Sequence, residues 1–152
     1  TLVIDMKDDF GFVRYDSQDE EIQAVGAVRP FIELEDFTAK AKERNVYLVA
    51  RIVVFKDKQL YRYRKNLYAV KDKNGNPWQG YKTVDETTEP IEEYWVDPYN
   101  ENVWKYNTAI AQELIRRGFD EIQFDYIRFP TDGENLYAAR YPAQSGGGSA
   151  RE

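Results

Sequence analysis

A strand-like run late in the chain, residues 121–128, places apolar and polar side chains on opposite sides. Successive side chains of an extended strand alternate between its two faces. One side therefore receives the apolar residues, and the other receives Gln123 and Asp125, with Arg128 further along the run. Polar side chains near the carboxyl end of a parallel strand are where chemistry is usually found in α/β folds. Asp125 is therefore the leading candidate for a catalytic residue.

Two further runs, residues 2–7 and 46–55, also have the character of strands. The first repeats the alternation of the late run, with Asp5 on its polar side. The second is the most apolar run of the chain, which is typical of a strand covered on both faces. Arg51 interrupts it, and a guanidinium there costs on the order of several kcal/mol unless it meets a carboxylate. We therefore predict that Arg51 pairs with Asp5 or Asp125.

The spacing of apolar residues predicts helices near residues 30–44 and 100–117, with Pro30 as the first helical residue of the former. Helices that alternate with strands predict parallel strands joined by right-handed crossovers. A closed barrel of this kind needs eight strands, whereas three are predicted here. The chain is therefore either a small open α/β sheet or part of a (β/α)8 barrel. Because it starts inside a strand and ends in a glycine-rich run, we expect the second.

The predicted barrel segment covers residues 1–130 and contains a long connection at residues 57–97. This connection is far longer than an ordinary strand-to-helix loop and is rich in Tyr and Trp. We expect it to form an aromatic flap that faces the substrate. Residues 131–152 are polar and end in a run of Gly and Ser, so we expect a mobile loop or tail.

The absence of Cys and His excludes several kinds of chemistry. It rules out thiol catalysis, disulfides, the usual zinc sites and a Ser-His-Asp triad, and we expect neither a metal nor a cofactor. A net charge of −6, with acids and bases well mixed, argues against a nucleic-acid partner. No apolar run is long enough to span a membrane. The 12 Tyr and 3 Trp favour a carbohydrate partner, because aromatic faces stack on sugar rings.

Four motifs together resemble one known protein family. They are residues 3–9 (VIDMKDD), 47–57 (YLVARIVVFKD), 95–99 (WVDPY) and 119–130 (FDEIQFDYIRFP). In this order they resemble the putative glycoside-hydrolase domain family, a bacterial TIM-barrel group. The resemblance implies that the chain holds roughly strands two to four of an eight-stranded barrel, with the remainder of the barrel outside these residues. A family resemblance implies a fold more strongly than an activity.

The resemblance also implies hydrolysis of glycosidic bonds by two carboxylates, one an acid and the other a nucleophile or base. Asp125 matches the usual place of the nucleophile in related barrels, and Arg51 and Arg128 would hold it ionised. Asp5 is the second predicted catalytic residue, placed to position a sugar hydroxyl or to supply charge. The general acid commonly comes from a later strand, so we expect the isolated chain to be inactive. The predicted substrate-binding residues are Arg51, Arg128, Asp97, Lys56, Trp78 and Trp95.

Two other interpretations stay open. One is a non-catalytic carbohydrate-binding or cell-wall-associated domain, and the other is a structural domain in which Asp5, Arg51 and Asp125 only neutralise one another. Asp97 precedes a proline and is more typical of a turn, and the tryptophans equally fit a small core beneath the insertion.

The sequence says less about cations and location. Asp8 and Asp9 are a weak candidate for a hard-cation site, because adjacent acids on a strand point apart. The absence of Cys suits an exported protein and a cytosolic one equally. Our working expectation is an extracytoplasmic or cell-envelope location.

Overall fold

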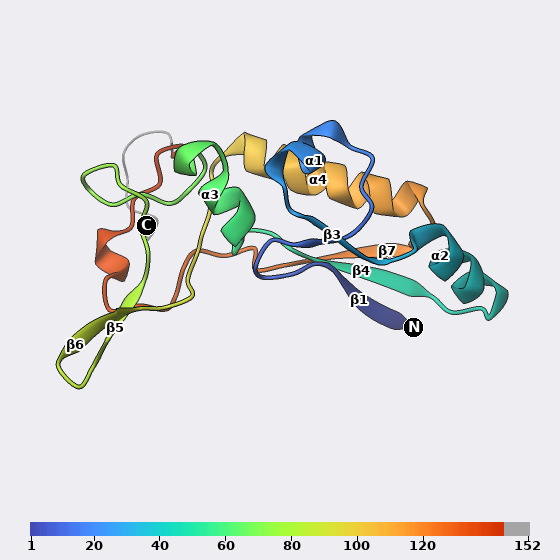
Figure 1. The fold of residues 1–152 in the computed structure, drawn as a ribbon, viewed down its shortest axis with the longest axis horizontal. Helices are drawn as coiled ribbons and strands as arrows, with labels where there is room; N and C mark the ends of the chain where they lie inside the picture. The colour runs from blue at the N-terminus through green and yellow to red at the C-terminus, as the bar shows by residue number, and fades with distance from the viewer. Residues whose placement is uncertain (145–152) are drawn as a thin grey trace.

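The computed structural model describes residues 1–144, which form a five-stranded mixed sheet with helices packed on one side (Figure 1). The strands β1, β4 and β7 are parallel to one another, whereas β2 pairs antiparallel with β1 and parallel with β3. In sheet order the strands are β3 (Val28–Ile32), β2 (Val13–Tyr15), β1 (Leu2–Lys7), β4 (Leu48–Val53) and β7 (Glu121–Asp125).

Four helices and a separate hairpin complete the described fold. The helices are α1 (Glu20–Val25), α2 (Leu34–Glu43), α3 (Lys58–Asn66) and α4 (Glu101–Arg116), followed by a short 3-10 helix, η1 (Leu136–Ala138). The hairpin is formed by β5 (Tyr81–Val84) and β6 (Thr87–Pro90), and it extends away from the sheet (Figure 1). Asp85 and Glu86 at its tip both have positive φ, as a tight two-residue hairpin turn requires.

The core lies between α4 and the sheet. Val103, Ile110 and Leu114 recur at helical spacing along α4 and are fully buried. They face the side of the sheet that carries Ala50 and Ile52, which are also fully buried. In Figure 1, α1 and α4 lie over this same side of the sheet. Amphipathic patterning therefore decides which face the helices cover.

The opposite face of the sheet carries the polar residues. Parallel register places Asp5 beside Arg51, and Arg51 beside Gln123. Asp5 and Gln123 are exposed, and no helix of the described residues covers this face in Figure 1. We call it the open face. It is where the sequence predicted the inward side of a barrel.

The expected architecture, three parallel strands of a (β/α)8 barrel, is wrong for this chain. The observed fold is a small α/β domain whose sheet contains five strands and an antiparallel pair. Gly11, with a φ of +83°, turns the chain after β1, so that Val13 pairs back onto Lys7. The 152 residues therefore do not form a complete barrel.

Element bounds differ most around Pro30. The helix expected at residues 30–44 begins only at Leu34, because residues 28–32 form β3. β3 is an edge strand, where a proline without an N–H removes no ladder hydrogen bond. The helix expected at residues 100–117 is α4, and the expected strands are β1, β4 and β7 with shorter bounds for the last two.

The polar segment expected at residues 131–152 is partly described. Asn135 accepts a hydrogen bond from the Trp78 indole through its backbone oxygen and from the Tyr81 N–H through its side chain. Arg140 and Lys71 exchange backbone hydrogen bonds in both directions. Residues 131–144 therefore pack onto the long connection, while the rest of that expected segment lies outside the described residues.

A buried ion pair joins the carboxyl ends of β1 and β4. The Lys7 Nζ lies 2.7 Å from Asp57 Oδ2, and both side chains are fully buried. The same ammonium donates to the backbone oxygen of Val53 (2.7 Å) and to Asn107 Oδ1 on α4 (2.9 Å). Asp57 also caps α3 by accepting from the Leu60 N–H. One charged pair therefore connects two strands and two helices.

Gly11 and Gly75 have nearly equal φ, so substitutions at the two positions distinguish the cost of backbone strain from the cost of contact with the Lys7–Asp57 pair. A Cβ added at Gly11 would lie 1.9 Å from Asp57 Oδ1, whereas one at Gly75 would meet nothing within 4 Å. Both positions have φ near +80°, so alanine costs about 1–2 kcal/mol at either one. We expect Gly11→Ala to lower the free energy of unfolding well beyond the loss in Gly75→Ala, as measured by urea denaturation. Equal losses would contradict close packing against Asp57.

Removal of one partner tests how much the buried Lys7–Asp57 pair contributes to the free energy of unfolding. Lys7→Met leaves the Asp57 carboxylate buried without a counter-charge, which typically costs about 3–5 kcal/mol. The control Lys40→Met breaks the exposed Lys40–Asp36 pair on α2, for which we expect a change within about 0.5 kcal/mol. Urea denaturation of both variants provides the comparison. A loss below about 1 kcal/mol in Lys7→Met would contradict the description of an anchoring pair.

Candidate functional site

Three charged side chains meet on the open face at neighbouring strands. The Arg51 guanidinium donates to Asp5 Oδ1 over 3.0 Å from Nη1, and to Asp125 Oδ2 over 2.9 Å from Nε. Its Nη2 lies 2.7 Å from the same Asp125 oxygen. The predicted pairing of Arg51 is thus confirmed with both carboxylates. Asp5, Arg51 and Asp125 form what we call the central triad.

The triad remains accessible. The side chains of Asp5 and Asp125 are 55% and 39% exposed, whereas that of Arg51 is 23% exposed. Because Arg51 lies on the middle strand of the three, its guanidinium reaches a carboxylate on either side. Ion pairs this exposed contribute little to folding stability, so stability alone does not account for the triad.

Local backbone structure holds Asp125 in its ionised form. β7 ends at Asp125, and the next residue, Tyr126, has a φ of +53°, so the chain leaves the extended conformation directly after Asp125. The Tyr126 N–H donates to Asp125 Oδ1 over 2.7 Å. The Tyr126 N–H, the Arg51 guanidinium and the charge of Arg128 together lower the pKa of Asp125. A carboxylate of lowered pKa suits a nucleophile or base and is unsuited to a general acid.

Cations and aromatic rings continue the site beyond Asp125. The Arg128 guanidinium lies 4.9 Å from the centroid of the Trp95 ring and 5.0 Å from that of Tyr126. The Lys56 ammonium lies 5.7 Å from the same Tyr126 ring and 3.5 Å from Glu93 Oε1. Lys56 and Arg128, both predicted as substrate-binding residues, therefore lie around one tyrosine next to Asp125.

Glu93 is a member of this site that sequence analysis missed. Its residue is only 8% exposed, and its carboxylate accepts a hydrogen bond from the Trp95 indole and pairs with Lys56. Glu93 lies in the long connection. Lys56, just after β4, pairs with Trp95, and this pairing brings Glu93 close to the end of β4. The only sequence signal was a pair of acids, Glu92 and Glu93, directly before two aromatic residues.

The structure places Trp78, Trp95 and Asp97 in its interior. Trp78 is 1% exposed and Trp95 is 0% exposed, so neither offers an open ring face for a sugar. Asp97 is 2% exposed and accepts from the backbone N–H groups of Tyr99 (2.9 Å) and Ala143 (2.8 Å). Burial raises the pKa of Asp97. These positions match the core and turn alternatives rather than a substrate platform.

Asp8 and Asp9 have partners within the protein. Asp8 pairs with Arg14 and accepts from the Phe10 and Phe12 N–H groups, and Asp9 lies 3.9 Å from Lys56. Over residues 1–144, no group of three acidic, His or Cys side chains is arranged to hold a metal ion. Within the same residues, no helix has both the length and the apolar character needed to cross a membrane.

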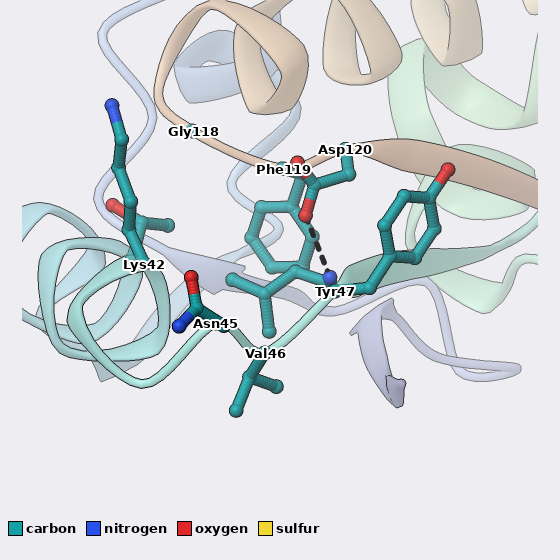
Figure 2. Close-up of a pocket in the computed structure, with 9 residues that line it drawn as sticks. Lys42, Asn45, Val46, Tyr47, Gly118, Phe119 and Asp120 are labelled. Carbon is teal, nitrogen blue, oxygen red and sulfur yellow. Dashed lines mark hydrogen bonds between the residues drawn. The ribbon is translucent and has the colours of Figure 1, made fainter.

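A separate pocket of about 440 Å³ lies at the amino ends of β4 and β7, at the far end of the strands from Asp125. Figure 2 shows Lys42, Asn45, Tyr47 and Phe119 around it. Its one carboxylate, Asp120, accepts a hydrogen bond from the Leu48 N–H, drawn as the dashed line. That contact joins the starts of the two strands, and the pocket contains no second carboxylate for hydrolysis.

Comparison with known proteins identifies the family. A family model described as "Putative glycosyl hydrolase domain" matches residues 1–150. The chain belongs to this family. The resemblance predicted from the four sequence motifs is thereby confirmed.

One solved structure shares both fold and sequence with this member of the glycosyl hydrolase domain family. It is the crystal structure of a hypothetical protein from Ruminiclostridium thermocellum ATCC 27405, with 35% sequence identity and a TM-score of 0.75. The match covers 93% of this chain and 66% of that chain, so the chain spans just under two thirds of its relative. No curated protein matches this chain.

The ionisation of Asp125 tests the geometry of the central triad. Arg51→Met removes a neighbouring positive charge, so we expect the pKa of Asp125 to rise toward its ordinary value. A carboxyl group with a lowered folded-state pKa stabilises the protein above its unfolded pKa, and this contribution is lost as the pH falls through the folded pKa. Arg51→Met should therefore lose less stability on acidification than the unaltered protein.

Carbon-detected NMR titration of the Asp125 carboxyl measures this shift directly. Lys40→Met, which breaks the distant exposed pair on α2, provides a control that should leave the Asp125 titration unchanged. An Asp125 pKa that does not move in Arg51→Met would contradict the contacts of the triad.

Proposed function

We propose that this chain takes part in hydrolysis of glycosidic bonds in an oligo- or polysaccharide, with Asp125 as nucleophile or base. The observation that carries the proposal is an accessible, ionised carboxylate at the end of β7, held by Arg51 and by the Tyr126 N–H. Family membership supports the reaction class. Both carboxylates of the central triad face the same open surface, where a sugar can approach.

Hydrolysis needs two carboxyl groups with opposite tasks. A nucleophile or base must be ionised, whereas the acid must keep its proton until the leaving oxygen takes it. Asp125 fits the first task, and Asp5, which shares its guanidinium, fits orientation of a sugar hydroxyl. The raised pKa of Asp97 would suit an acid, but both of its oxygens accept backbone N–H groups in the interior. We propose that the acid comes from outside residues 1–144, as in related barrels, where it commonly comes from a later strand.

A second candidate is a carbohydrate-binding domain that has no catalytic activity. The observation that favours it is the sharing of one guanidinium by Asp5 and Asp125, which engages both carboxylates in ion pairs. A binding domain would retain the open face and would use the triad to donate and accept hydrogen bonds with sugar hydroxyls. The two candidates differ in whether Asp125 is required for bond cleavage.

Activated substrates separate the two candidates. A dinitrophenyl glycoside has a leaving group that departs without protonation, so its cleavage depends on the nucleophile or base alone. We expect the chain to release dinitrophenolate from such glycosides while leaving natural glycans intact. Asp125→Asn should lower this release by about a hundredfold or more, the scale of a lost catalytic group.

Asp85→Asn at the exposed tip of the hairpin is the matched control, because it makes the same chemical change far from the triad. It should leave the release rate unchanged. Sugar binding by the unaltered protein without any release of dinitrophenolate would favour the binding domain. Turnover of a natural glycan by the chain alone would contradict the missing general acid.

A further inference from the structure

Basic side chains stack on aromatic rings around the carboxyl ends of β4 and β7. Arg128 lies over the Trp95 and Tyr126 rings, and Lys56 also lies over the Tyr126 ring. One residue before Trp95, the Tyr94 ring receives the Lys58 ammonium at 4.6 Å and the Arg62 guanidinium at 5.5 Å. Lys56 and Arg128 therefore lie next to Asp125, and Lys58 and Arg62 lie around Tyr94, in a protein whose net charge is −6.

Carboxylates within the protein balance only part of this charge. Lys58 lies 3.2 Å from Glu92, and Lys56 lies 3.5 Å from Glu93. Within residues 1–144, neither Arg62 nor Arg128 has a carboxylate oxygen within 4.0 Å. Of these two arginines, Arg128 is the one whose charge acts on Asp125. A guanidinium without an ion-pair partner within 4.0 Å among the described residues thus lies next to the proposed nucleophile.

The hydrogen bonds of Arg128 leave one edge of its guanidinium for a ligand. Its Nη1 donates to the backbone oxygen of Phe129 (3.2 Å) and to Thr131 Oγ1 (2.7 Å). Nε and Nη2 donate to no group of the described residues. The Trp95 and Tyr126 rings lie against the guanidinium, and the planar fork of its remaining edge matches the two oxygens of a carboxylate.

We propose that the substrate carries a carboxylate, as uronic acid residues do, and that Arg128 receives this group next to Asp125. The proposal rests on the proposed function of the central triad and adds the chemical class of its sugar. A neutral sugar would offer hydroxyls, which accept from one or two donors but do not compensate the charge. The alternative role for Arg128 is to cover the buried Trp95 ring, and this role requires no anionic ligand.

Pairs of ligands that differ only in a negative charge test whether the site prefers a carboxylate. The probes are a galacturonate trisaccharide, a glucuronate-containing trisaccharide and their methyl esters, which keep the sugar and remove only the negative charge. Affinity for the unaltered protein is measured by calorimetry or NMR titration. Because hydrogen bonds to charged groups are stronger than neutral ones, we expect at least one acid to bind about tenfold or more tightly than its ester.

Two variants assign this preference to Arg128. Arg128→Gln should remove the difference between acid and ester, and Arg128→Lys, which keeps the charge but not the fork, should retain part of it. Arg116→Gln removes one positive charge from an exposed position on α4 and should leave the preference intact. Thermal unfolding of each variant shows whether the cover over Trp95 and the fold persist.

Each other outcome is decisive. Equal binding of acids and esters overturns the anionic sugar, while release of dinitrophenolate that is lost in Asp125→Asn would leave the proposed function standing. A preference for the acid that survives in Arg128→Gln overturns the assignment to Arg128. Failure of all probes to bind also overturns the inference, and release of dinitrophenolate then decides separately whether Asp125 cleaves glycosides.

Discussion

A break in the register of β1 is the constraint on which both charged clusters depend. Pairing with β4 runs regularly from Leu2 to Asp5 and then shifts, so that Lys7 stands opposite Ile52. Without this irregularity, Asp5 and Lys7 would share one face of the strand. The extra residue lets Asp5 reach the open face while Lys7 turns toward α4. Two residues apart in sequence, one charge is exposed and the other is fully buried.

The buried and the exposed clusters are connected through the backbone of β4. Lys7 donates to the backbone oxygens of Val53 and Val54, where β4 ends. The Val54 N–H in turn donates to the backbone oxygen of Asp125 over 2.9 Å. The buried pair therefore fixes the strand end against which the proposed nucleophile is placed. A charge inside the core is costly, and here it positions the strand end beside Asp125 as well as joining four elements.

The site is built from opposite charges at the carboxyl end of β7. Asp125 receives an N–H and a guanidinium, both of which favour its anionic form. Arg128 remains beside it with no carboxylate of its own among the described residues. Under the proposed function, an anionic Asp125 next to a guanidinium without an ion-pair partner among those residues fits a substrate that brings both an electrophilic carbon and a negative group. Family membership supports the proposed reaction class, and these contacts are the reason for the proposed sugar.

Period-two and helical patterns in the sequence were enough to locate β1, β4, β7 and α4, because apolar side chains recur in each at the spacing of a strand or a helix. They also predicted the pairing of Arg51, since a guanidinium in an apolar strand needs a carboxylate and only neighbouring strands could provide one. The catalytic role of Asp125 remains a prediction.

Other features depended on contacts between residues far apart in sequence. The register shift in β1, the Lys7–Asp57 pair and the return of Glu93 to β4 leave no periodic signal, because each arises from an approach across 35 residues or more. β2 and β3 were missed for another reason: they are short strands, and the turn at Gly11 brings β2 onto β1, where β3 pairs with β2. Local patterning determined which side of each strand is apolar. Tertiary packing decided which charges became buried, since burial depends on what covers a side chain rather than on its neighbours in sequence.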